Sequence, residues 1–338
     1  MGRDKKYYRT MQQQAYDRLT AMQAFGESKR DAIKNGTADG KIFSFTTYKT
    51  YWQQTKQYVR WVEKEHPECR TLKKARAFVP EYLQRSVDEG KSAWTVQTQT
   101  AALNKLYGIR MTDEDRFEPP VRHRVDIVRS RGEAARDRHF SERNNDELIR
   151  FCRGTGARRA GLTRLRGRDL VTRDQIDQHV RRLESLGRDL TDRERTQLTV
   201  CRDAQRFDGC AYFVYLKEKG GRERISPIVG PDTEKIVERF RETKPDEKVW
   251  KYVSSNADVH GYRADYAKRV YLMYARDTDE LRKEHATFEY KGRTVSAVYV
   301  CRGDEKGRML DKAAMSLASK ALGHSRIEVV ANNYIRGL

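Results

Sequence analysis

Hydrophobic residues in the first third of the chain recur every three or four positions, which is the spacing of an amphipathic helix. The clearest stripe comprises Tyr48, Tyr51, Trp52, Thr55, Tyr58, Val59 and Val62. We expect this stripe to be buried in a helical bundle, with Thr46 or Thr47 capping the helix N-terminus. Lys49, Lys56 and Arg60 fall on the other faces of the same helix and are expected to point outward.

The same periodicity predicts three further helices, over residues 8–24, 71–88 and 92–107. Ser92 is expected to open the last of these helices and Gly108 to close it. The first third of the chain therefore predicts a small all-α unit, which we place at residues 1–125.

Beyond residue 110 the hydrophobic periodicity fades, and Pro119-Pro120 interrupts any helix. We interpret residues 126–138 as a linker and residues 139–338 as a second domain. That domain begins with a segment that Ser141 or Asn144 could cap.

Two apolar runs in the second domain, residues 211–216 and 224–228, read as strands joined at Gly220-Gly221. The highly charged segment 174–208 looks helical and insertion-like. The predicted fold class is therefore mainly α with a small β-sheet, in which an all-α unit precedes a mixed α/β domain.

Charge narrows the function classes. The 338 residues include 69 Lys and Arg against 49 Asp and Glu, a net charge of +20. Such an excess favours a polyanionic partner, most commonly nucleic acid. Without a long apolar run or a secretory N-terminus, we expect a soluble, intracellular protein. Five scattered cysteines favour neither a disulfide framework nor a structural metal site.

The segment 155–170 is the first that suggests chemistry. Gly156 permits a tight turn, after which Leu162 and Leu165 could fix a helix to the core. Arg158 would then lie at the helix N-terminus, where backbone N–H groups and a guanidinium can converge on a phosphate. Arg159 is the alternative to Arg158.

Three further patterns carry candidate chemistry. Lys219 would lie at the tip of the predicted hairpin, with Lys217 as the alternative. His260 and Arg263 are three residues apart in a predicted helix, so their side chains could project from the same side of that helix and donate hydrogen bonds together. At the C-terminus, a Leu322-Gly323-His324 turn precedes Tyr334 by ten residues.

In this order, the candidate residues resemble the signature of the tyrosine recombinases, also called the phage integrase family. The residues concerned are Arg158, Lys219, His260, Arg263, His324 and Tyr334. The resemblance implies that Tyr334 attacks DNA to form a 3′-phosphotyrosine and that Arg158 and Arg263 hold the phosphate. It further implies that Lys219 protonates the leaving 5′ oxygen and that His260 and His324 move protons or donate hydrogen bonds.

The resemblance implies no metal and no nucleotide cofactor. It makes residues 1–125 a helical core-binding (SAM-like) domain and residues 139–338 the catalytic domain. The expected partner is double-stranded DNA, bound by a homo-tetramer on two sites, with possible accessory DNA-bending or directionality proteins. The expected role is integration or excision of a mobile element. The expected location is the cytoplasm, in association with the nucleoid. Further DNA contacts are expected from Arg159, Lys49, Lys56, Arg60 and Arg302.

The sequence departs from the family pattern in three places. Gly161 stands where the family usually has an acid. Arg263 and His324 are 61 residues apart, which implies an insertion over residues 276–312. That insertion contains a Tyr299-x-x-Arg302 pattern, which competes with His260-x-x-Arg263 for the same place in the signature. A predicted loop follows it. Only four residues follow Tyr334, so subunits would have to dock through the tyrosine segment itself or through another surface.

Other functions stay open at this point. A catalytically impaired relative would bind DNA through the same charge without the chemistry. A type IB topoisomerase would use similar residues to relax supercoils, although the Leu-Gly-His ending favours a recombinase. A basic RNA-binding protein would explain the charge but not the ordered motifs.

Overall fold

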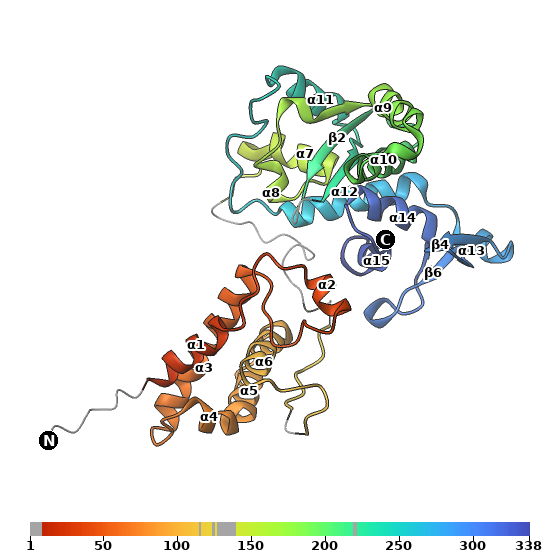
Figure 1. Ribbon diagram of the computed structural model, residues 1–338. Helices are drawn as coiled ribbons and strands as arrows, with labels where there is room; N and C mark the ends of the chain where they lie inside the picture. The colour runs from red at the N-terminus through yellow and green to blue at the C-terminus, as the bar shows by residue number, and fades with distance from the viewer. Residues whose placement is uncertain (1–8, 115, 124–125, 127–139, 219–221) are drawn as a thin grey trace. The chain divides into compact units, whose positions relative to one another are not determined.

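The computed structural model describes residues 9–114, 116–123, 126, 140–218 and 222–338 (Figure 1). The described residues are mainly helical, with small antiparallel sheets, which confirms the predicted fold class at that level. The chain divides into two compact units, residues 1–123 and 124–338, and each is described by itself. Most of the predicted linker, residues 126–138, lies outside the described residues. Among the described residues, no helix is both long and apolar enough to cross a membrane.

The first unit is all-α. Its elements are α1 (Met11–Thr20), α2 (Lys29–Lys34), α3 (Phe45–Glu65), α4 (Leu72–Ala75), η1 (Arg76–Phe78), α5 (Val79–Asp88) and α6 (Ala93–Tyr107). The long helix α3 packs against α1 and α6. Its predicted stripe lies in the core, where Tyr58, Val59 and Val62 are fully buried.

The predicted N-cap of α3 was wrong. Ser44, not Thr46 or Thr47, caps the helix, because its Oγ accepts a hydrogen bond from the Thr47 N–H at 3.1 Å. Phe45 already begins the first turn, so only the extended residue before it can offer an oxygen to the free N–H groups. The expected helix over 8–24 is shorter, since the Ile42 N–H donates to the Met22 carbonyl at 2.7 Å and draws that backbone out of the helix.

The single helix predicted over 71–88 was also wrong, because it divides into α4, η1 and α5. Pro80 lies in the first turn of α5, where a helix needs no N–H donor. In the middle of one continuous helix, the same proline would remove a backbone hydrogen bond and interrupt the helix. The last helix agrees with the prediction. Ser92 caps α6, and Gly108, with φ of +69°, ends it in the left-handed conformation.

The second unit begins with helices and a three-stranded sheet. Its first elements are η3 (Arg143–Asn145), α7 (Asp146–Thr155), α8 (Arg159–Leu162), η4 (Gly167–Asp169), β1 (Leu170–Thr172), α9 (Arg173–Ser185), η5 (Gly187–Asp189), α10 (Asp192–Gln205), β2 (Tyr212–Lys217) and β3 (Glu223–Pro227). The order β1-β2-β3 is antiparallel throughout, and Val214 lies opposite both Leu170 and Ser226. Strand β1 was not predicted, because three residues are too few to show alternation. The Gly220-Gly221 turn lies outside the described residues.

The remaining elements are α11 (Thr233–Glu242), α12 (Val259–Tyr274), α13 (Thr278–Lys283), β4 (Thr287–Tyr290), β5 (Arg293–Ser296), β6 (Val298–Val300), η7 (Gly303–Glu305), β7 (Met309–Asp311), α14 (Lys312–Ala321) and α15 (Glu328–Asn333). Helix α12 packs against α7 and α14 and lies at the centre of this unit (Figure 1). Residues 276–312, the predicted insertion, form α13 and two small hairpins, and residues 174–208 contain α9 and α10.

The predicted caps of α7 need correction. Asn145 occupies the N-cap position without a side-chain hydrogen bond to the helix. Ser141 Oγ instead accepts from the Asn144 N–H at 3.2 Å, so it caps the preceding turn η3. Asn144 is a donor there and not a cap. Hydrophobic periodicity does not indicate the 3₁₀ turn η3. Because of this turn, α7 begins at Asp146, two residues after Asn144.

Candidate active site

Two buried arginines join segments of the second unit that are far apart in sequence. Arg263 on α12 is 0% exposed and donates hydrogen bonds to the carbonyls of Gly156 and Leu322. Arg224 on β3 is 4% exposed and donates to the carbonyls of Gly156, at 3.1 Å, and Ala321. The backbone before Arg158 and the Leu-Gly-His turn are therefore held against each other by two cations.

Two glycines make this close approach possible. Gly156 ends α7 with φ of +59°, and a Cβ there would lie 2.2 Å from the Tyr266 ring. Gly323 has φ of +69°, and a Cβ there would lie 2.8 Å from Cδ of Arg224. Both positions need a left-handed conformation and the absence of a side chain, which glycine alone supplies.

The Tyr334 hydroxyl lies between an imidazole and a guanidinium. It is 3.3 Å from Nε2 of His324 and 3.4 Å from Nε of Arg263. The two rings have centroids 5.4 Å apart, and Tyr334 follows the last residue of α15. A phenol in this position has one group that can accept its proton and another that can stabilise its anion.

The surroundings keep His324 neutral. Burial, together with the nearby charges of Arg263, Arg158, Arg224 and Arg222, lowers the pKa of its imidazole to about 4. Burial and the neighbouring Arg224 lower the pKa of Arg263 to about 10, so this guanidinium is still charged at neutral pH. The site therefore combines an unprotonated imidazole with several permanent positive charges.

Arg158 is the more accessible arginine of the cluster. It precedes α8 at the N-cap position, and its side chain is 28% exposed. Its Nη1 makes an ion pair of 2.8 Å with Oε2 of Glu218, whose side chain is 2% exposed. Burial raises the pKa of Glu218, but Arg224 and Arg158 together lower it below its usual range, so the carboxylate stays ionised. Leu162 and Leu165 are both buried, as predicted, but only Leu162 belongs to the helix, because α8 ends there.

Four other candidates of the second unit belong to the described residues. Arg159 donates to the carbonyls of Val253, Ser254, Ser255 and Ala257, the last at 2.7 Å, and so holds that loop. His260 is exposed in the first turn of α12, whereas Arg263 is buried, so the two side chains do not face the same environment. Lys219 lies outside the described residues, and Lys217 is exposed at the end of β2. Arg302 is exposed in the predicted loop, before η7.

Three DNA-contact candidates belong to the first unit. Lys49 and Arg60 on α3 are exposed, and Lys56 is partly buried. All three lie off the apolar stripe of the helix, as its periodicity predicts.

Sequence reasoning missed Glu218 and Arg224. A signal was present, because β3 alternates and places Arg224 and Ser226 on its buried face. Charged and polar residues at inward positions of a strand require internal partners. Here Arg224 donates to Oε1 of Glu218 from Nη2 at 2.9 Å.

The insertion holds the residues that follow Tyr334. Arg308 Nη1 donates to the Ile335 carbonyl at 2.8 Å. Arg336 lies 3.6 Å from a carboxylate oxygen of Asp304 and 3.5 Å from one of Glu305. The turn at η7 therefore fastens the tyrosine segment to its own chain.

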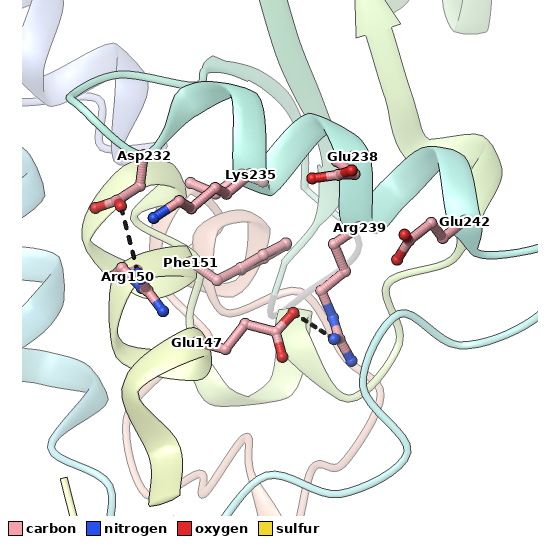
Figure 2. A pocket seen from close by; sticks show the side chains of 9 residues that line it. Glu147, Arg150, Phe151, Asp232, Lys235, Glu238, Arg239 and Glu242 are labelled. Atoms are coloured by element: carbon pink, nitrogen blue, oxygen red, sulfur yellow. Dashed lines mark hydrogen bonds and ion pairs between the residues drawn. The ribbon is translucent and has the colours of Figure 1, made fainter. Parts of the chain in front are cut away.

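A separate hollow of about 210 Å³ lies between α7 and α11 (Figure 2). Four of its charged residues form two ion pairs across the gap, Arg150 with Asp232 at 3.9 Å and Arg239 with Glu147. Lys235, Glu238 and Glu242 also line it. The hollow is thus bordered by paired ions and does not include the tyrosine or the arginines described above.

Comparisons with known proteins add little to this geometry. No family model matches the sequence, and no curated protein matches it. Among solved structures the chain is similar to the crystal structure of XerA recombinase, with 14% sequence identity. The match covers 96% of this chain and 94% of that chain, at a TM-score of 0.25. So low a TM-score does not establish a common fold.

Proposed function

We propose that this protein is a site-specific DNA recombinase of the tyrosine type, in which Tyr334 cuts and rejoins DNA strands through a 3′-phosphotyrosine. The observation that carries the proposal is the position of the Tyr334 hydroxyl between His324 and Arg263. The order of the motifs along the sequence supports it independently. The net charge of +20 supplies attraction to the DNA backbone.

In the first step, the Tyr334 oxygen attacks the scissile phosphorus while the bond from phosphorus to the 5′ oxygen breaks. The neutral His324 imidazole takes the phenolic proton, since its nitrogen is already within reach. The leaving 5′ oxygen takes a proton from Lys219 or, in its place, Lys217. The phosphotyrosine retains the energy of the phosphodiester, so a 5′ hydroxyl can reverse the step without a nucleotide.

The two arginines have different roles in this proposal. Arg158, partly exposed, holds the non-bridging oxygens and stabilises the added charge of the transition state. Arg263 is fully buried and close to the phenol, so it acts on the developing phenolate more than on the phosphate. This differs from the symmetrical roles that the resemblance implies. His260 reaches the reaction only if bound DNA changes its surroundings.

The other parts of the proposal rest on sequence and charge. The first unit serves as the core-binding domain, with Lys49, Lys56 and Arg60 facing the DNA backbone. A homo-tetramer on two sites would carry out integration or excision of a mobile element. Strand relaxation of the type IB topoisomerase kind uses the same cleavage step and is the alternative activity.

A catalytically impaired DNA-binding relative is the second candidate. Two observations favour it. His260 is exposed whereas Arg263 is buried, and the guanidinium of Arg263 already donates hydrogen bonds to backbone carbonyls. In such a protein the charge cluster would only stabilise the fold.

A covalent trapping assay tests the proposal. The full chain is incubated, without added metal, with nicked suicide duplexes taken from the DNA that flanks its own gene. Wild type should form an adduct that survives denaturant, and Tyr334→Phe should form none while binding the same DNA. Tyr299→Phe, which alters the Tyr299-x-x-Arg302 pattern that competes with the His260-x-x-Arg263 motif, should keep the adduct. Salt-dependent binding without an adduct in wild type would favour the impaired relative.

A further inference from the structure

We propose that Glu218 is the positioning residue for Arg158, so that the β2–β3 hairpin supplies the acid that the Arg158 segment lacks at Gly161. The inference rests on the proposed function. It concerns which element orients the phosphate-binding arginine, and it assigns a role to a buried carboxylate that the reaction itself does not use.

The carboxylate of Glu218 is divided between two arginines. Oε1 accepts hydrogen bonds from Arg224, from Nε at 3.2 Å and from Nη2 at 2.9 Å. Oε2 makes the 2.8 Å ion pair with Nη1 of Arg158, and among the described residues it accepts no hydrogen bond of good geometry. One side of the carboxylate is therefore anchored in the core, and the other faces the partly exposed guanidinium.

The anchor is rigid because Arg224 is itself held by backbone. Its guanidinium donates to the carbonyls of Gly156 and Ala321, and to Ser226 on the same strand. Arg224 is thus unable to follow Arg158 if that side chain moves. The bridge ties the orientation of Arg158 to the same carbonyls that surround the tyrosine site.

The strand geometry explains why the acid comes from the hairpin. A Cβ on Gly161 would lie 3.4 Å from Cδ2 of Leu216, so position 161 faces an apolar side chain. Leu216 and Glu218 are two residues apart, and successive side chains of an extended chain alternate in direction. Both are buried, and the second of them reaches Arg158. Leucine packs on the glycine, and glutamate takes the position beside the guanidinium.

A double-mutant cycle on adduct formation tests this inference. The rate is measured with the suicide duplex for wild type, Glu218→Gln, Arg158→Gln and the double variant, with circular dichroism as the folding check. We expect Glu218→Gln to slow the reaction about tenfold or more, as loss of a supporting contact does at other sites. In the Arg158→Gln background the same change should have no more than about a twofold effect. Glu184→Gln, in an exposed ion pair, is the matched control.

Equal slowing in both backgrounds would show a merely structural role and overturn the inference, as would an unchanged rate in Glu218→Gln. If Glu218→Gln does not fold, Glu218→Asp takes its place, because it keeps the charge beside Arg224 but shortens the reach to Arg158.

A second readout does not depend on catalysis. The heteronuclear NOE of Arg158 Nε in the full chain should fall in the variant, and an unchanged value overturns the inference even where wild type forms no adduct. The absence of any wild-type adduct would contradict the proposed function alone.

Discussion

The hydroxyl of Tyr334 lies 3.3 Å from Nε2 of His324, a residue ten positions earlier in the chain. The contact is local in sequence, yet its chemistry is set by distant residues. Arg158, Arg224 and Arg263 belong to three other elements, and their charges help to keep the imidazole unprotonated. An unprotonated imidazole nitrogen is thus placed beside the tyrosine hydroxyl in the structure itself.

The first prediction concerns pH and stability. Because the pKa of His324 is about 4 in the folded chain and about 6.5 in an unfolded one, the unfolded state binds more protons between these values. The free energy of unfolding should therefore fall as pH falls from about 6.5 toward 4, by less than about 1.4 kcal/mol per pH unit because the ring is partly exposed. Urea titrations at pH 5 and pH 7 measure this slope. His324→Gln should flatten it, and His260→Gln, at an exposed position, should not.

A second prediction tests the close contact at Gly156. Gly156→Ala should lower the free energy of unfolding by about 2–5 kcal/mol, because the left-handed conformation costs about 1–2 kcal/mol and the clash with the Tyr266 ring adds about 1–3 kcal/mol. Gly187→Ala is the control, since it has φ of +60° and open space around its Cβ. Urea denaturation of both variants should separate the clash from the backbone cost. Equal losses would mean that the ring moves aside freely.

A third prediction addresses the buried ion pair. Arg224→Met should cost about 3–5 kcal/mol, because it leaves the buried Glu218 with less compensation. Adding Glu218→Met should restore part of that loss, since neither charge then stays buried alone. Arg202→Met removes an exposed pair with Glu184 and should cost less than about 1 kcal/mol. Thermal or urea denaturation of wild type, Arg224→Met, the double variant and Arg202→Met measures these losses. A double variant no more stable than Arg224→Met would contradict this account.

The fourth prediction concerns the segment after Tyr334. Glu305→Gln weakens the contacts with Arg308 and Arg336, so amide hydrogens of residues 328–338 should exchange several-fold faster. Global stability should fall by about 1–2 kcal/mol, because the side chains of these pairs are only 16–21% exposed and are partly shielded from solvent. Hydrogen exchange read by mass spectrometry measures both. Glu289→Gln, elsewhere in the same insertion, should leave the C-terminal exchange unchanged, and no change in Glu305→Gln would show that the turn does not hold the tyrosine segment.

Much of the local structure follows from the sequence alone, because its causes are local. The stripe of α3, the cap at Ser92 and the left-handed ends at Gly108 and Gly156 depend on periodicity and on glycine. The turn that brings His324 near Tyr334 is equally local. The catalytic roles of these residues, and of Lys219, stay predictions.

Only the tertiary structure decided how the charges are arranged. The bonds from Arg263 and Arg224 to Gly156 join residues 107 and 68 positions apart, and the pair of Arg158 with Glu218 depends on the register of β2 and β3. Sequence periodicity shows which face of an element is buried. Which distant carbonyl or carboxylate meets that face depends on how the elements pack. For that reason Arg158 and Arg263 could be named as candidates but not their partners, and Arg224 was missed.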